Sequence, residues 1–401
     1  MRDPASAPPR WVRIVGVSLL LASSIVVGVV LAEVGLRQFQ PQIFPVHSQG
    51  MYVPNALYGT GLTPNFVGRF QRAEFDASFR INSAGFRGPE LRPRQDNTVR
   101  IVALGDSQTF GFGVLDHETY AVQLEQLLSR FHPELDIQVT NTGSPRYGTY
   151  HQLNLLRSRW EELDPDLVLL QFLPVNDFQD NREAVRQLHP QVRDGMLISP
   201  SAAPDDVPRP AWVRVLYWSK SQFHLARLLS ESAGYLSMRL GMAQHVDALW
   251  GEDFSDDDAV LTQELLEQVA TTAHRGGARA LFLYSTAKTA MMGSTYVVPR
   301  SRAVLQQAAQ NTGAMWVDLN ELMREHERPH RFYFVRDGHW SPAGHRVIAE
   351  ILASRIVDLS LLSTDPGAGP ATVPVSSATN DKLSVEHGLR PILRNSGTEA
   401  R

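Results

Sequence analysis

VRIVALGDSQT, residues 99–109, passes within a few positions from an apolar run to a polar loop. The run 99–104 predicts a buried strand, and Gly105 and Asp106 then open a turn that leads into Ser107. Such a turn lifts the Ser107 hydroxyl to the carboxyl edge of a sheet, where open α/β folds place their chemistry. Because a serine hydroxyl becomes a strong nucleophile only beside a base, this stretch points to partners elsewhere in the chain.

An acid and a histidine suited to that role stand far along the chain, in the run DGHW at 337–340. Their spacing lets both side chains leave the same side of an extended loop, so Asp337 can hold one ring nitrogen of His339 while the other faces Ser107. Asn176 follows another strand-like run and offers its amide to a developing oxyanion, together with backbone N–H groups at Ser107 and in the loop 143–148. These residues predict an acyl-transfer site.

From residue 98 onward, apolar strand-like runs alternate with helical patterns. Strands are predicted at 99–104, 137–140, 167–173, 280–284 and 315–318, and helices at 120–131, 150–162, 261–274 and 302–311. Ser341 and Pro342 give the N-cap and first turn of a last helix, which runs to about residue 356. Nearly all-apolar strands that alternate with helices predict a parallel sheet covered on both faces.

Four blocks, in this order, resemble the SGNH (GDSL-type) hydrolase superfamily. They are GDSQTFGFGV at 105–114, NTGSPRYGT at 141–149, VND at 175–177 and DGHWSPAGH at 337–345. The resemblance implies a three-layer α/β/α sandwich with a mostly parallel sheet (SGNH/flavodoxin-like), with Ser107 as nucleophile, His339 as base and Asp337 as its orienting acid. The upstream run NSAGFRG at 82–88 resembles a stretch that often precedes these blocks in bacterial envelope members, and we expect it to be a structural brace rather than a rim of the site.

The chain departs from the family pattern at two positions beside the expected oxyanion hole. The second-block glycine falls on Arg146, with Gly143 and Gly148 as the alternatives, and Val175 stands where the third block usually has glycine. An arginine keeps the backbone N–H but adds a charged side chain beside the site. The predicted oxyanion-hole residues are therefore Ser107, Arg146 and Asn176.

Composition and spacing argue against several other classes of protein. A net charge of −4 lacks the excess of positive charge that is typical of nucleic-acid-binding proteins. The lack of cysteine excludes disulfides and a cysteine nucleophile. His151, His224 and His274 have no carboxylate or histidine partners at metal-ligand spacing, and no dinucleotide fingerprint is present, so we predict no metal and no cofactor. Asp106 is expected to fix its loop and His345 to be structural, whereas Trp340 is expected either to line a subsite or to pack in the core.

The N-terminus predicts a membrane anchor. Arg2, Arg10 and Arg13 precede residues 14–32, an unbroken stretch without charge. As a helix this stretch spans roughly 28 Å, close to the ~30 Å thickness of the hydrocarbon core. The arginines favour the cytoplasmic side, which places the rest of the chain on the periplasmic or extracellular side. Cleavage after Ala32, which would release a secreted protein, is the alternative.

Domain boundaries follow from composition. Residues 1–35 are predicted to be a cytoplasmic stub and anchor, and 36–97 an irregular extension that packs on the core. The hydrolase domain is predicted at 98–360, with an insertion at 182–260 that is either a lid or peripheral. Residues 361–401, rich in small and polar residues, are expected to be disordered.

The predicted function is a membrane-anchored serine ester hydrolase that acts on O-acyl, above all O-acetyl, groups of envelope or extracellular glycans. The expected partners are an ester-bearing small molecule or glycan and the membrane. Acetyl transfer on the same substrates is one alternative. The other is a catalytically silent glycan-binding or assembly protein, which the departures at Arg146 and Val175 favour and the intact Ser107, Asp337 and His339 disfavour.

Overall fold

The computed structural model describes residues 10–42, 49–186, 191–193, 196–198, 211–239, 254–285, 288–291 and 299–362. The expected disordered tail falls outside these residues apart from 361–362, and so does part of the insertion at 182–260. Two helices are described within that insertion, α7 (Ala211–Gln222) and α8 (His224–Arg239).

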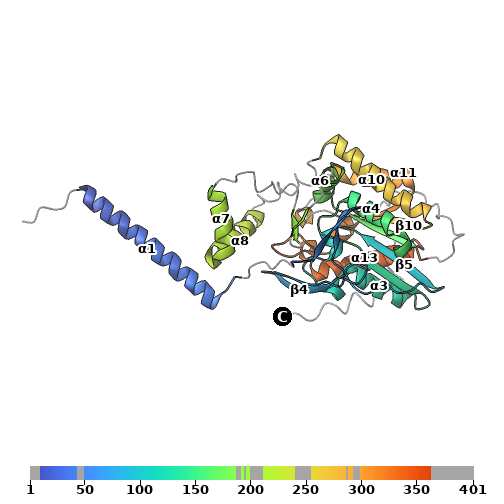
Figure 1. Ribbon diagram of the computed structural model, residues 1–401, viewed down its shortest axis with the longest axis horizontal. Helices are drawn as coiled ribbons and strands as arrows, with labels where there is room; N and C mark the ends of the chain where they lie inside the picture. The colour runs from blue at the N-terminus through green and yellow to red at the C-terminus, as the bar shows by residue number, and fades with distance from the viewer. Residues whose placement is uncertain are drawn as a thin grey trace, which may run out of the picture. The chain divides into compact units, whose positions relative to one another are not determined.

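A five-stranded parallel sheet forms the centre of the fold, as predicted (Figure 1). Its strands are β5 (Thr98–Leu104), β6 (Asp136–Asn141), β7 (Leu167–Phe172), β10 (Arg279–Tyr284) and β11 (Met315–Asp318). They lie in the order β11-β10-β7-β5-β6, and every adjacent pair is parallel. The sequence predicted these strands to within one or two residues at each end.

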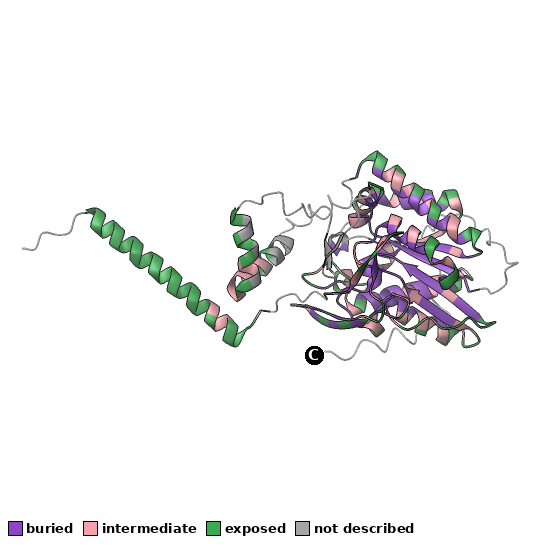
Figure 2. Cartoon of the chain, in the orientation of Figure 1, coloured by how far each residue is buried: buried purple, intermediate pink, exposed green. Residues whose placement is uncertain are grey.

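Helices cover both faces of the sheet. One face carries α3 (Tyr120–Phe131) and α13 (Pro342–Asp358), and the other carries α4 (Thr149–Ser158), α10 (Asp256–Arg275) and α11 (Arg300–Thr312). Residues 101–104 of β5 alternate between the two cores, and most residues of the five strands are buried (Figure 2). The three-layer α/β/α fold is therefore confirmed. The helix predicted at 150–162 is two helices, because Arg159 leaves helical geometry after α4.

The strand order reverses direction beside β5. The chain runs from β5 outward to the edge strand β6 and then returns to β7 on the other side of β5. The connections that leave β5 and β7 therefore diverge, and in open parallel sheets this switch point is where ligands bind. Ser107 follows β5 and Asn176 follows β7, so both lie at this point.

Residues 52–80 correct the prediction of irregular structure for 36–97. They form two antiparallel hairpins: β1 (Tyr52–Asn55) with β2 (Gly59–Leu62), and β3 (Val67–Arg72) with β4 (Phe75–Arg80). Alternate residues of β4 are buried, so its apolar face packs inward while its polar face meets solvent. Strand pairing satisfies the backbone groups that an irregular segment would leave to water.

The run at 82–88 acts as a brace, as expected. Arg87 is 2% exposed and forms an ion pair with Asp116. Its guanidinium also donates to the carbonyl oxygens of Phe110, Gly111 and Val114, at 2.8, 2.5 and 2.6 Å. These carbonyls follow the nucleophile loop, so a buried arginine with four hydrogen bonds fixes the shape of that segment.

Besides the N-terminal helix, the remaining described elements are mostly short. They are α2 (Ser107–Phe110), η1 (Asp116–Glu118), α5 (Trp160–Leu163), α6 (Pro174–Val185), β8 (Gln191–Arg193), β9 (Met196–Ile198), η2 (Lys288–Met291), α12 (Leu319–Arg324) and η3 (Pro329–Phe332).

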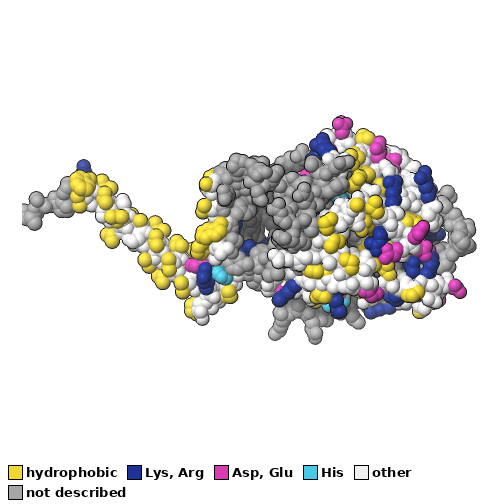
Figure 3. All heavy atoms as spheres, in the orientation of Figure 1, with side chains coloured by type: hydrophobic (Ala, Val, Ile, Leu, Met, Phe, Trp, Pro, Cys, Tyr) yellow, Lys and Arg dark blue, Asp and Glu magenta, His cyan; other side chains and the backbone are white. Residues whose placement is uncertain are grey.

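The N-terminal helix α1 (Arg10–Phe39) is a candidate membrane span by length and composition. None of its residues is buried, and its visible surface is covered mainly by hydrophobic side chains (Figure 3). Glu33, near its end, accepts hydrogen bonds from the backbone N–H groups of His224 and Leu225 at 3.1 and 2.8 Å. Those are first-turn amides of α8, which a helix cannot satisfy by itself.

Trp340 packs in the core rather than along a subsite. It is 0% exposed, and its ring meets Tyr120 and His345 edge to face. Trp340→Ala is therefore expected to lower the free energy of unfolding by about 3–5 kcal/mol, as measured by urea denaturation. Trp340→Phe, which keeps most of the packing, is the milder control. An unchanged stability with a raised KM for substrate would contradict the core assignment.

Candidate active site

The nucleophile loop is held by a helix cap and by close packing. Asp106 is the N-cap of α2 and its Oδ1 accepts the Gln108 N–H at 2.8 Å. A Cβ at Gly105 would lie 2.0 Å from Thr109 Oγ1, so the loop tolerates only glycine there. Ser107 follows at the first position of α2. Asp106 thus fixes the loop, as the sequence suggested.

Ser107, His339 and Asp337 form one hydrogen-bonded series. The Ser107 hydroxyl lies 2.8 Å from His339 Nε2, and His339 Nδ1 lies 2.5 Å from Asp337 Oδ1. The backbone N–H of His339 also donates to that same carboxylate oxygen, at 3.0 Å. The structure therefore brings together the three residues that the sequence singled out. This arrangement suits a base that takes the serine proton while an acid holds its tautomer.

Asp337 is kept ionised by its neighbours. Burial would raise the pKa of its carboxyl, but hydrogen bonds from His339 and the charges of His339 and Arg72 outweigh burial and hold the pKa well below its usual value. The Arg72 guanidinium bonds directly to Asp337 Oδ2. Arg72 belongs to β3, and no sequence signal connected that hairpin to the loop at 337–340.

Gln108 joins the nucleophile loop to the histidine loop, a role that no sequence motif predicted. Its Nε2 donates to the Gly338 carbonyl at 3.1 Å, and its Oε1 accepts the Trp340 N–H at 2.9 Å. These two bonds hold the backbone on both sides of His339. The only available signal was the position of Gln108 next to the serine.

Asn176, at the start of α6 after β7, contacts the nucleophile loop. Its Nδ2 donates to Asp106 Oδ2 at 2.9 Å, and the amide nitrogen carries a second hydrogen. Burial raises the pKa of the Asp106 carboxyl. Hydrogen bonds from the Gln108 backbone and the Asn176 side chain, together with the charge of His339, act in the opposite direction. The Asp106 contact thus fixes the side-chain amide of Asn176 beside Ser107.

The second-block loop closes on the nucleophile loop. Ser144 N donates to the Gly105 carbonyl at 3.2 Å, and a Cβ at Gly143 would lie 2.4 Å from Phe110 N. Arg146 has a φ of +69°, a conformation that favours glycine, whereas Gly148 has a φ of −90°. The backbone therefore favours Arg146 as the position that aligns with the family's glycine.

An acid stands close to Arg146. Burial raises the pKa of Asp180, on α6, to about 7, although the charge of Arg146 lowers it. Asp180 lies one turn beyond Asn176 on the same helix. The candidate oxyanion hole is thus flanked by an arginine and an acid that titrates near neutral pH.

His345 is structural, as expected. Burial lowers its pKa to about 3, which keeps the ring neutral, and its Nδ1 accepts the Tyr120 N–H at 3.2 Å. Among the residues that the structure describes, no cluster of three or more histidine, aspartate and glutamate side chains fits a metal ion.

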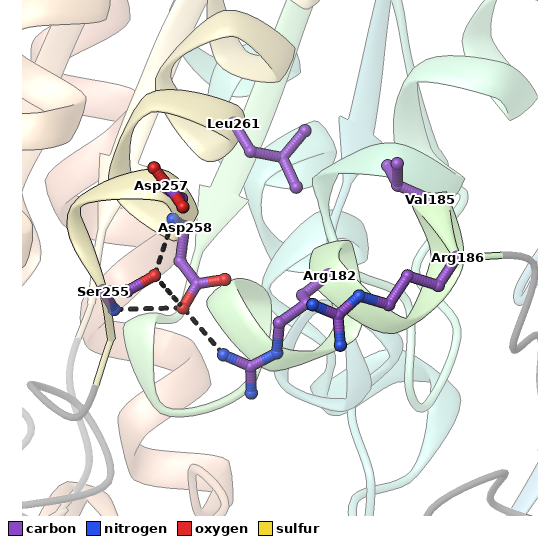
Figure 4. Close-up of a pocket in the computed structure, with 7 residues that line it drawn as sticks. All are labelled: Arg182, Val185, Arg186, Ser255, Asp257, Asp258 and Leu261. Atoms are coloured by element: carbon purple, nitrogen blue, oxygen red, sulfur yellow. Dashed lines mark hydrogen bonds and ion pairs between the residues drawn. The ribbon is translucent and has the colours of Figure 1, made fainter.

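Two cavities lie away from Ser107. One, of about 690 Å³, is lined by α6 and the start of α10, where Arg182 pairs with Asp258 at 2.7 Å (Figure 4). The other, of about 190 Å³, is lined by the first hairpin and by the loops at 84–86 and 142–147. Neither cavity is lined by Ser107, His339 or Asp337.

The central part of the chain is similar to a known protein family. The sequence model of the GDSL-like lipase/acylhydrolase family matches residues 103–347, a range that contains Ser107, Asn176, Asp337 and His339 and leaves both N-terminal hairpins outside. Comparison with curated proteins gives no match.

Solved structures give weaker similarity. LAE5, an α/β hydrolase from the metagenome of Lake Arreo, Spain, is 15% identical, with 67% of this chain and 97% of that chain covered and a TM-score of 0.36. A lipase/acylhydrolase from Enterococcus faecalis is 16% identical, with 64% and 95% covered and a TM-score of 0.35. A catalytic mutant of Axe2, an acetylxylan esterase from Geobacillus stearothermophilus, is 15% identical, with 69% and 98% covered and a TM-score of 0.35.

Proposed function

The chain belongs to the GDSL-like lipase/acylhydrolase family and is an SGNH-type serine esterase, and we propose that it acts through an acyl-enzyme on Ser107. The observation that carries this proposal is the hydrogen-bonded series from Ser107 through His339 to Asp337 at the switch point of the sheet. The series leaves a nucleophile, a base and an ionised acid in the order that acyl transfer requires.

In the proposed first step, Ser107 Oγ attacks the ester carbonyl carbon while His339 Nε2 takes the hydroxyl proton. The backbone N–H groups of Ser107 and Arg146 and the side-chain amide of Asn176 bind the oxyanion. The bond to the leaving alcohol then breaks, and His339 returns the proton to that alcohol. Water releases the acyl group by the same route, and an acceptor hydroxyl in place of water would make the same site a transferase.

The proposed substrates are O-acetyl esters of envelope or extracellular glycans. The orientation expected in a membrane supports this proposal. Helix α1 is a candidate membrane span, and Arg10 and Arg13 at its start favour the cytoplasmic side. In that orientation the catalytic domain faces the periplasm or the exterior, where acetylated polysaccharides lie. We propose that α1 remains as the anchor.

Acetate release tests this proposal. The full chain in detergent is incubated with O-acetylated xylan oligosaccharides, and free acetate is compared with acetyl groups gained by an unacetylated acceptor. Free acetate supports the hydrolase, and acetylated acceptor supports the transferase. Glycan binding without either product would favour the silent binding protein.

Asn176→Ala tests the oxyanion hole. Loss of one such donor typically lowers kcat by about 10²–10³-fold, and we expect that loss with little change in KM for p-nitrophenyl acetate. Gln179→Ala is the matched control, since Gln179 lies on the same helix but bonds to Glu183 on its exposed side. A kcat for Asn176→Ala within fivefold of the wild type would remove Asn176 from the proposed site.

A further inference from the structure

The β3–β4 hairpin touches the acid–histidine loop at two adjacent positions. Arg72, the last residue of β3, bonds to Asp337 Oδ2 through its guanidinium. Glu74, in the turn between the strands, accepts the backbone N–H of Arg336 at 2.6 Å. One turn of the hairpin therefore holds both the side chain of the acid and the backbone just before it.

Aromatic rings fix the direction of Arg72. Its guanidinium carbon lies 4.9 Å from the centroid of Phe112, and the Phe112 ring lies 4.7 Å from that of His339. Phe75, which follows the turn, packs on Phe334 with centroids 4.9 Å apart. Arg72 is therefore stacked on the ring that also contacts the histidine, which limits its freedom to turn to solvent.

The contact with Oδ2 has a geometric consequence for the acid. Asp337 Oδ1 already accepts two N–H groups of His339. With a charged donor on Oδ2 as well, both ends of the carboxylate are held, so the group cannot rotate away from the imidazole. Asp337 is 9% exposed and Arg72 39% exposed, so solvent screens this charge pair only in part.

We propose that Arg72 is a positioning residue that holds Asp337 in line with His339. It belongs to a hairpin that lies outside the residues matched by the family model. This inference rests on the proposed function of Ser107. It assigns the N-terminal hairpin a part in the rate of the reaction as well as in the fold.

Three other charged groups near the loop, among the residues that the structure describes, are Lys288, Glu74 and Asp106. Lys288 Nζ donates to the carbonyls of Phe334 and Val335 at 2.8 and 2.5 Å, and its charge also acts on Asp337. Glu74 faces the backbone of Arg336, and Asp106 acts on the histidine from the nucleophile loop. Arg72 is the guanidinium that bonds directly to the Asp337 carboxylate.

Steady-state kinetics of the full chain in detergent test the proposal. For Arg72→Gln, kcat with p-nitrophenyl acetate is expected to fall about 10–100-fold while KM changes less than about threefold, because misalignment of the acid slows the chemical step without removing a substrate contact. Arg72→Lys should recover part of the loss. The matched control is Arg69→Gln, on the same strand, since Arg69 pairs with Asp76 across the hairpin. Its kcat should stay within twofold of the wild type.

The pH profile separates positioning from simple loss of packing. The charge of Arg72 helps to hold the pKa of the Asp337 carboxyl below its usual value, so its removal lets that carboxyl take up a proton at higher pH. The acidic limb of kcat/KM should therefore move to higher pH in Arg72→Gln, by roughly half a unit for a partly screened charge. Arg69→Gln should leave the limb in place.

Combination with Asp337→Asn gives the decisive comparison. If Arg72 acts through Asp337, then Arg72→Gln lowers kcat in the wild type but causes no further loss in Asp337→Asn. Equal losses in both backgrounds, or a single variant with unchanged kcat and pH profile, would overturn the proposal.

Failure of the proposed function has a different signature. The wild type would then give neither turnover nor a fluorophosphonate adduct at Ser107. In that case urea denaturation of the wild type, Arg72→Gln, Asp337→Asn and the double variant still decides whether Arg72 positions Asp337. A non-additive loss of stability supports the contact, and additive losses overturn it.

Discussion

Ser107→Ala is expected to lower kcat for p-nitrophenyl acetate by about 10⁶-fold, the loss typical when the nucleophile of such a triad is removed. The alanine leaves the oxyanion donors and Asn176 in place but gives His339 no hydroxyl to deprotonate. Stability should change little, since the one bond lost is the 2.8 Å contact between Ser107 Oγ and His339 Nε2. The measurement is initial rate together with the urea denaturation curve.

A fluorophosphonate probe gives an independent reading of the same variant. The full-length wild type should gain one equivalent of adduct by intact mass, and Ser107→Ala should gain none. Ser144→Ala is the control, because Ser144 lies on the neighbouring loop with its N–H bonded to Gly105. An adduct that survives in Ser107→Ala, or a turnover unchanged by it, would remove Ser107 from the role of nucleophile.

The central sheet and its covering helices could be predicted from the sequence because hydrophobic periodicity and helix caps are local patterns. The predicted bounds of the helix at 120–131 and of the strand at 315–318 match α3 and β11. Ser341 caps α13 by accepting the Gly344 N–H, as the serine and proline there indicated. Local periodicity and caps depend on neighbours in sequence, so a single chain carries them.

The hairpins were missed although part of the signal was present. Phe75, Ala77 and Phe79 are buried while the residues between them are exposed, which is the period of two that marks a strand. That run is only six residues long, and its turn, Ala73 and Glu74, lacks the glycine that marks most tight hairpins. The surrounding proline, glycine and asparagine then favoured an irregular segment.

The contacts between distant segments left almost no signal in the sequence. Arg72 and Asp337 lie 265 positions apart, and Gln108 and Gly338 lie 230 apart. Motif spacing identified the residues that react, because their chemistry fixes their types. It did not identify the residues that hold them, since an arginine or a glutamine on a surface segment has many ordinary uses.

Asp337→Asn is expected to lower kcat by about 10⁴-fold, the loss typical when the acid of such a triad becomes an amide. The side chain keeps its size, so the fold should persist. What changes is the donor and acceptor pattern: a carboxylate accepts on both sides, whereas an amide accepts on one and donates on the other. Asp76→Asn, in the exposed pair with Arg69, is the matched control and should leave kcat within twofold.

The contacts of Asp337 explain why an amide there is so damaging. Oδ2 faces the guanidinium of Arg72, a charged group that can only donate, so the amide oxygen is drawn to that side and the NH₂ group turns toward His339, whose backbone N–H then loses its acceptor. The imidazole must then accept at Nδ1 and carry its proton on Nε2, where it faces Ser107 and cannot take the serine proton. Removing Arg72 from this variant frees the amide to turn its oxygen to His339. The double variant Arg72→Gln/Asp337→Asn should therefore be at least as active as Asp337→Asn alone. A further loss in the double variant would show that Arg72 does not set the orientation at residue 337.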